Sequence, residues 1–306
     1  LLPPETADPL IAEFIHDLEK LAALLDGVIN DVVYAEVVGH GEIWSARLMS
    51  AVLRQRDIDA SWLDARDFLR AERAAQPQVD EGKSLLLLQQ LIAQHPSQRL
   101  VVTGFICAND AGETVLLGRN GSDYSATQIG SLAGVSRVTI WSDVAGVYSA
   151  DPLKVKDACL LPLLRLDEDS ELARLAAPVL HTRQLQPGSN SDNDLQLRCS
   201  YQPEQGSTRI ERVLASGSGA KIVTSHDDIC LIELDIAAGH DFAHAHKDVE
   251  LLLKRAQIKP LAIGVHADRN QLQLCYTSEV VNSALAVLED AALPGRLTLR
   301  EGLALV

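Results

Sequence analysis

Gly118-Arg119-Asn120-Gly121-Ser122-Asp123-Tyr124-Ser125-Ala126 is the stretch of this 306-residue chain that decides its fold. It joins a predicted strand over 113–117 to a predicted helix over 121–133. Free backbone N–H groups and the helix dipole favour an anion at such a helix start, and Arg119 adds a planar group suited to a carboxylate or phosphate. The alternative is an ordinary glycine turn capped by Ser122, with the arginine in solvent.

The sequence on either side alternates between helical and strand patterns. Helices are predicted over 8–25, through 43–53 and over 80–94, and strands over 58–63, 99–105, 113–117 and 137–141. Strands separated by helices favour an α/β fold, a three-layer sandwich whose mainly parallel sheet is covered on both faces.

The pattern changes after a segment rich in glycine and polar residues at 203–219. Strands are then predicted over 221–224, 229–234, 261–266, 272–276 and 296–299, and helices over 246–256 and 283–292. This order is close to a βαββαβ unit of the ferredoxin-like α+β type. We therefore place a domain boundary near residue 213, with domains at 1–212 and 213–306.

A second polar segment, 141–152, follows the strand over 137–141. Ser142 and Asp143 lie at the strand end, where they could contact a ribose or a metal-bound phosphate, and Tyr148 could offer a flat surface to a nucleobase. A strand-end turn with a buried tyrosine explains the same residues equally well.

Composition excludes several classes of partner. The formal net charge of -15 argues against nucleic acid and against an anionic membrane surface. The five cysteines form no CxxC pair, and no apolar run approaches the ~20 residues that span a bilayer, so the expected location is the cytoplasm. His240, His244 and His246 lie close in sequence, but without further ligands they do not predict a metal site.

These motifs resemble those of the aspartokinases, within the amino-acid kinase family. Residues 118–126 look like the signature GRGGSDYSA with only Asn120 differing, and 142–152 resembles the nucleotide segment TDVxGxYxxDP. Glu42 in Gly-Glu-Ile-Trp-Ser and the pair Gly104-Phe105 match two further family positions. The resemblance covers essentially the whole chain and is nearest to the methionine-type enzymes fused to a homoserine dehydrogenase.

The resemblance implies roles for individual residues. Arg119 would pair with a carboxylate of L-aspartate, Glu42 would hold its ammonium group, and Phe105 and Ser122 would complete the acceptor pocket. Asp123 would organise the active site electrostatically. Ser142, Asp143 and Tyr148 would line the site of ATP, which enters with Mg²⁺. The implied reaction gives 4-phospho-L-aspartate, the first step of threonine, methionine and lysine biosynthesis.

The resemblance also implies the architecture beyond the kinase. The C-terminal unit resembles an ACT domain, a regulatory module through which the chain would self-associate, with or without an amino-acid ligand.

Three departures from the family pattern bear on activity. The chain starts after the family's first strand and its KFGGS-type lysine loop, Leu153 stands where the family has a phosphate-binding arginine, and Pro178 replaces a lysine. Losing such cations commonly costs orders of magnitude in rate, so we expect this polypeptide by itself to be nearly inactive. One alternative is a degenerate kinase fold that acts as an oligomerisation scaffold for a fused dehydrogenase. Another, a kinase for a different amino acid or a nucleoside monophosphate, leaves the 118–126 match unexplained.

Overall fold

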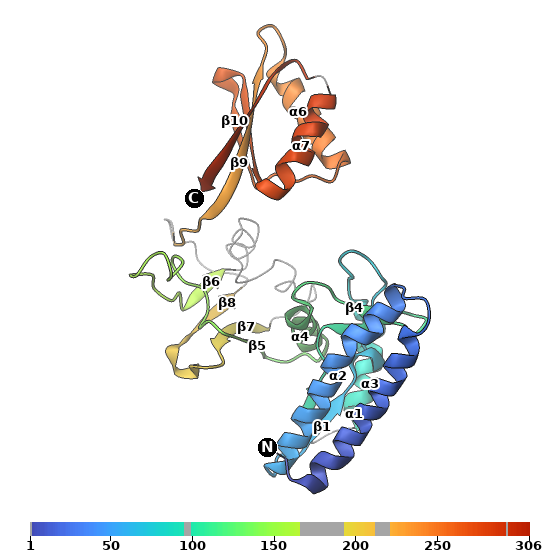
Figure 1. Cartoon of the computed structure of the whole chain (residues 1–306). Coiled ribbons are helices and arrows are strands. Elements are labelled where there is room, and N and C mark those ends of the chain that lie inside the picture. Colours follow the sequence, from blue (N-terminus) through green and yellow to red (C-terminus); the bar gives the residue numbers. More distant parts are fainter. Residues whose placement is uncertain (1, 95–98, 166–192, 212–220, 292) are drawn as a thin grey trace. The chain divides into compact units, whose positions relative to one another are not determined.

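A computed structural model describes residues 2–94, 99–165, 193–211, 221–291 and 293–306 (Figure 1). The described residues form two compact units. The first comprises 2–146, 162–165 and 193–211, and the second comprises 147–161 and the described residues from 221 onward. The boundary that we placed near 213, and Pro178, lie outside the described residues.

The first unit contains helices and short strands in alternation. The helices are α1 (Pro4–Leu25), α2 (Asp31–Gln55), η1 (Ala65–Asp67), α3 (Glu81–Gln94), α4 (Gly121–Leu132) and η2 (Pro203–Gln205). The strands are β1 (Ala60–Leu63), β2 (Arg99–Val102), β3 (Ile106–Ala108), β4 (Thr114–Leu116), β5 (Arg137–Ser142), β6 (Leu163–Arg165), β7 (Asp194–Cys199) and β8 (Ser207–Glu211).

The strands of this unit pair in mixed sheets. β1 pairs with β2 in parallel, and β3 with β4 antiparallel. A four-stranded sheet has the order β5-β7-β8-β6, in which β5–β7 and β6–β8 are parallel and β7–β8 is antiparallel. The α/β class is thus confirmed. The single strand predicted over 99–105 is wrong, because the backbone turns sharply at Phe105 and divides the apolar run into β2 and β3.

The two N-terminal helices begin earlier than the sequence pattern predicts. α1 starts at Pro4. Proline suits the first helical position, because an N–H group there would have no partner within the helix. Pro9, at the start of the helix predicted over 8–25, lies inside α1. α2 starts after Asn30, whose Oδ1 accepts hydrogen bonds from the N–H groups of Val32 and Val33, both at 3.0 Å.

Packing around the β3–β4 hairpin forms the core that supports the site. Buried apolar side chains from η1, α3, β3, β4 and α4 meet there, among them Phe68, Leu69, Leu88, Leu117 and Tyr124. Each has an exposed fraction of 3% or less. The start of α4 and the hairpin therefore rest on one rigid cluster.

The second unit is a βαββαβ arrangement. Its elements are β9 (His226–Ile236), α6 (Phe242–Arg255), β10 (Ala262–His266), η3 (Ala267–Arg269), β11 (Gln271–Thr277), α7 (Ser278–Asp290) and β12 (Gly295–Leu305). The strands form one antiparallel sheet in the order β10-β11-β9-β12, and α6 and α7 cover one face of it (Figure 1). Ile232, Leu234, Val249, Tyr276 and Leu288 belong to its core.

The strand predicted over 221–224 is absent from this unit. The structure assigns these residues to no strand, and the N–H of Val223 donates instead to the carbonyl oxygen of Ser149 at 2.9 Å. None of the described helices is both long enough and apolar enough to cross a membrane.

Candidate functional site

The loop before α4 is shaped by two residues with positive φ. Gly118 has φ 80° and Asn120 has φ 55°, and the N–H of Gly121 donates to the carbonyl oxygen of Gly118 at 2.9 Å. Asn120 is the N-cap of α4, with no side-chain capping bond. The capping role considered for Ser122 is therefore wrong, and its side chain is exposed, as is that of Arg119. Both groups face solvent at the positive end of a helix.

Two glycines bring the turn after β2 against this helix start. A Cβ atom on Gly121 would lie 2.7 Å from Cδ2 of Phe105, and one on Gly104 would lie 3.2 Å from Cβ of Ser122. Neither approach is open to a residue with a side chain unless its neighbours move. The structure thus places Phe105 against Gly121, the residue before Ser122, and places Gly104 against Ser122 itself.

Phe105 holds this turn in a strained backbone conformation. Its φ is 64°, and the N–H of Ile106 donates to the carbonyl oxygen of Gly104 at 2.6 Å, which closes a three-residue turn. The N–H of Phe105 donates to Oγ of Ser125 at 3.2 Å, and its carbonyl accepts from the N–H of Leu117 at 2.8 Å. Such strain persists only where the surroundings hold it, which is typical of a ligand site.

Glu42 joins the same cluster from α2. Its carboxylate accepts a hydrogen bond from the backbone N–H of Gly104, beside Phe105. Burial raises the pKa of Glu42 and the Gly104 bond opposes that rise. In the first turn of α4, burial also raises the pKa of Asp123. Two partly desolvated carboxyl groups therefore flank the turn, where they would interact strongly with a cation.

The second polar segment is fixed at the end of β5. Oγ of Ser142 donates to Oδ1 of Asp143 at 2.9 Å. The carbonyl oxygen of Ser142 accepts from both N–H and Oγ of Ser200, at 2.8 and 2.9 Å, and Sγ of Cys199 lies 3.4 Å from the carbonyl oxygen of Asp143. Because β7 holds the backbone, the Asp143 carboxylate stays exposed at the carboxyl end of a parallel strand.

Tyr148 and Leu153 belong to the second unit. Tyr148 is half-buried and forms an isolated antiparallel bridge with Leu160. Leu153, which we take as a departure from the family pattern, has a side chain that is 96% exposed. Of the three histidines, His240 lies before α6, and His244 and His246 lie on it, 3.6 Å from Asp248 and 3.6 Å from Glu250 respectively.

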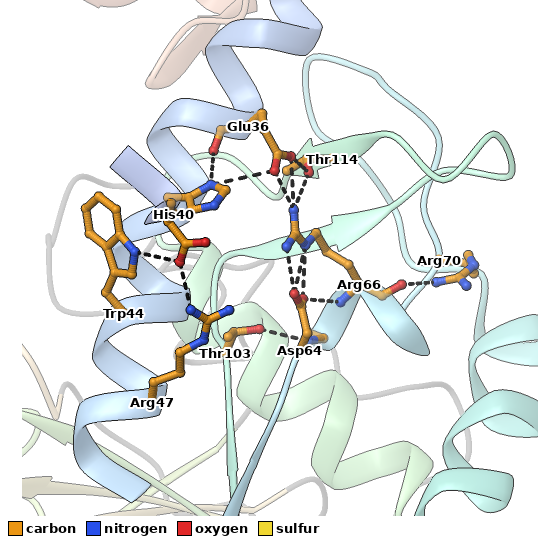
Figure 2. A network of polar contacts seen from close by, with 11 residues as sticks. Glu36, His40, Trp44, Arg47, Asp64, Arg66, Arg70, Thr103 and Thr114 are labelled. Atoms are coloured by element: carbon orange, nitrogen blue, oxygen red, sulfur yellow. Dashed lines mark hydrogen bonds and ion pairs between the residues drawn. The ribbon is translucent and has the colours of Figure 1, made fainter. Parts of the chain in front are cut away.

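Sequence reasoning missed a polar network beside the pocket (Figure 2). The guanidinium of Arg66 contacts Asp64, Glu36 and Thr114, and the N–H of Ala65 donates to Oγ1 of Thr103 at 2.8 Å. These residues carry no shared motif, and the signal that the sequence offers is one charged residue, Glu36, among the apolar residues of 32–38.

Comparison with known proteins decides the family. The model of the amino acid kinase family matches residues 6–198. The chain belongs to this family. It is 76% identical to the bifunctional aspartokinase/homoserine dehydrogenase 2 of Escherichia coli over all of its 306 residues, and it spans 38% of that relative's length. It is 37% identical to the lysine-sensitive aspartokinase 3 of E. coli over 204 residues, which are 65% of this chain and 45% of that one.

Solved structures agree with this family. The crystal structure of E. coli aspartokinase III in complex with aspartate and ADP matches with a TM-score of 0.75 and 26% identity, covering 96% of this chain and 68% of that one. The complex of the same enzyme with lysine and aspartate matches with a TM-score of 0.78 and 27% identity, covering 97% and 68%. The resemblance to the aspartokinases inferred from the motifs is confirmed.

Proposed function

We propose that this chain carries the aspartate kinase part of a bifunctional aspartokinase/homoserine dehydrogenase and transfers the γ-phosphoryl group of ATP to the side chain of L-aspartate. The observation that carries the proposal is the packing of Glu42, Gly104, Phe105 and Ser122 around the start of α4. That cluster offers a carboxylate for an ammonium group beside a helix start suited to an anion, which is the charge pattern of an amino acid.

Each proposed contact follows from charge and position. Glu42 binds the ammonium group of L-aspartate, and Arg119, exposed in the loop before α4, pairs with a carboxylate. Phe105 and Ser122 close the pocket around the acceptor. Asp123, a half-buried carboxyl group in the first turn of α4, sets the local field for the cations that accompany phosphate.

The chemistry needs alignment more than proton transfer. An oxygen of the aspartate side-chain carboxylate attacks the γ-phosphorus, the bond from that phosphorus to the bridging oxygen of ADP breaks, and ADP leaves with the electron pair. The carboxylate carries no proton to remove, so no general base is required. Mg²⁺ enters with ATP on its phosphates, and Ser142, Asp143 and Tyr148 are the residues that we assign to nucleotide binding.

We infer the domain organisation from the same comparison. Residues 1–212 form the kinase domain, in which β1–β2 and β5–β7 supply parallel pairs to a three-layer sandwich, although 147–161 group with the second compact unit. Residues 213–306 form an ACT-type domain that serves regulation and self-association. The antiparallel order β10-β11-β9-β12 with two helices on one face supports this part of the proposal.

Binding of L-aspartate tests the proposal directly. We expect calorimetric titration to show saturable binding in the presence of Mg-ADP, weakened roughly ten- to hundredfold by Arg119→Ala, because a charge-assisted bond to a carboxylate contributes about 1.5–3 kcal/mol. Arg137→Ala is the matched control, since Arg137 is also exposed and lies 3.6 Å from Asp194 on the β5–β7 pair. Equal affinity in the two variants would remove Arg119 from the site.

Activity is the second measurement. Mg-ATP-dependent phosphorylation of L-aspartate is assayed with this chain and with the chain extended by the upstream segment of the E. coli relative. Turnover in either form supports the kinase. Folded protein that neither binds nor phosphorylates aspartate in either form supports the oligomerisation scaffold instead.

A further inference from the structure

Arg66 is the centre of the polar network in Figure 2. Its guanidinium makes a two-pronged contact with Asp64, with Nε 3.0 Å from Oδ1 and Nη2 2.7 Å from Oδ2. Its Nη1 donates to Oε2 of Glu36 and to Oγ1 of Thr114, each at 2.9 Å. Thr114 also donates to Glu36, which closes the network into a ring.

Three routes lead from this ring to the proposed acceptor pocket. Glu36 lies on α2, the helix that also carries Glu42. Thr114 begins β4, which leads to Leu117 and its hydrogen bond to the carbonyl of Phe105. Ala65, next to Arg66, donates to Thr103, the residue before Gly104. The helix, the hairpin and the strained turn that surround the pocket are therefore all fastened to one short segment.

We propose that Arg66 is a positioning residue for the acceptor pocket, holding α2, β4 and the turn at Phe105 in the relative positions that let them bind L-aspartate. This inference rests on the proposed function, because the pocket is the one assigned there. Arg66 does not itself contact the substrate. It acts through Glu42, Phe105 and the loop that follows β4.

The chemistry of the ring explains why arginine occupies the position. Burial lowers the pKa of Arg66, but hydrogen bonds and charge from Asp64 and Glu36 outweigh burial and raise it above the ordinary value. The guanidinium is permanently charged and planar. Its Nε and Nη2 bind the Asp64 carboxylate, and its Nη1 binds the Glu36 carboxylate and the Thr114 hydroxyl. A lysine offers a single charged point and cannot span all three partners at once.

Arg47 provides a closely matched control. Arg47 lies on α2, its side chain is 20% exposed against 22% for Arg66, and its partner Asp17 is 11% exposed against 12% for Asp64. Nη1 of Arg47 lies 2.7 Å from Oδ2 of Asp17, which ties α1 to α2. Its guanidinium also stacks on Trp62 of β1, 4.8 Å from the ring centre. These contacts involve neither β4 nor the turn at Phe105.

The experiment compares Arg66→Lys with Arg47→Lys, each of which keeps the positive charge. We expect Arg66→Lys to raise the Kd for L-aspartate about tenfold, as for the loss of one charge-assisted bond, while the Kd for Mg-ADP stays within about twofold. Arg47→Lys leaves both constants unchanged. We expect both variants to lower the thermal midpoint. If Arg66 had only a structural role, the two variants would therefore not differ in aspartate affinity.

Hydrogen exchange supplies a readout that needs no ligand. Arg66→Lys should speed exchange of the amides at 103–106 and 117–121, and Arg47→Lys should not. Equal aspartate affinity in the two variants, or equal exchange at those amides, overturns the inference. If the unaltered chain binds no aspartate, the proposed function fails, and the exchange comparison alone decides whether Arg66 positions this segment.

Discussion

Lys154 is bonded to Asp227, seventy-three positions along the chain, with its Nζ atom 2.8 Å from Oδ2. The same ammonium group lies 2.9 Å from Oγ of Ser225, and the N–H of Val223 donates to Ser149 in the same segment. The stretch that carries Tyr148 is thereby tied to the residues that lead into β9. Within the second unit, these bonds connect the segment after Tyr148, which we assign to the nucleotide, with the start of β9.

Replacing Lys154 tests whether this tie matters for nucleotide binding. We expect Lys154→Ala to weaken Mg-ADP binding a few-fold, on the scale of one lost bond, and to leave the aspartate affinity unchanged. The thermal midpoint should stay the same, because both partners are exposed to solvent. Reversing the pair as Lys154→Asp with Asp227→Lys should restore binding. Unaltered Mg-ADP affinity in the single variant would show that the tie does not act on Tyr148.

Two glycines on α2 predict opposite effects of the same substitution. A Cβ atom on Gly39 would lie 2.9 Å from Cγ2 of Ile106, whereas one on Gly41 would meet nothing within 4 Å. Gly39→Ala should therefore destabilise the first unit by about 1–3 kcal/mol through overpacking. Gly41→Ala should stabilise it by roughly 0.5–1 kcal/mol, since alanine restricts the unfolded chain. Urea denaturation of both variants measures the difference, and the same sign for both would show that α2 does not pack this closely on β3.

At Phe105, we expect a glycine substitution to be less destabilising than an alanine substitution, the reverse of the usual order. Both Phe105→Ala and Phe105→Gly lose the ring, but alanine must also keep a φ of 64°. The glycine variant should therefore be the more stable of the two by about 1 kcal/mol. The comparison is made by chemical denaturation of the two variants side by side. An alanine variant that is as stable as the glycine variant would mean that the turn relaxes once the ring is gone.

Asp123 predicts a dependence of stability on pH. Because burial raises the pKa of Asp123 in the folded chain, the folded state binds this proton more tightly than the unfolded chain does. The contribution of Asp123 to stability is therefore full below the ordinary carboxyl pKa and is lost as pH rises through the raised one. Asp123→Asn should then gain stability over the unaltered chain at neutral pH, with the gain shrinking as the solution is acidified.

Thermal midpoints measured across the acidic range check this sign. Asp26→Asn, at the exposed end of α1, is the control for removing a negative charge from an acidic protein. A gain at neutral pH that is the same in both variants would reflect net charge alone. An Asp123→Asn variant that loses stability at neutral pH would contradict the role of burial at this carboxyl group.

Local chemistry in the sequence was sufficient to predict much of the fold. The helix over 80–94 and the strand over 137–141 appear within one residue of their predicted ends, because their apolar periodicity and flanking turns agree. The break at Phe105 could not be predicted, since no local signal distinguishes a strained turn inside an apolar run. It exists because Gly121 and Leu117, later in the chain, hold it.

The candidate site shows the same division. Residues 118–126 and Glu42 were identified from motifs, and Glu42 is placed against Gly104, which lies beside both Phe105 and Ser122. The ring around Arg66 was missed, because its members come from three separate parts of the chain and meet only after folding. Ion pairs of this kind depend on tertiary distance, which spacing along a sequence does not report.

The division of the chain into two units also decides how its unfolding can be followed optically. All three tryptophans, Trp44, Trp62 and Trp141, lie in the first unit. Indole emission therefore reports on the first unit alone, and unfolding of the antiparallel sheet in the second unit does not change it. Tyr276, fully buried there, is a site where an introduced tryptophan would add the unfolding of the second unit to the emission signal.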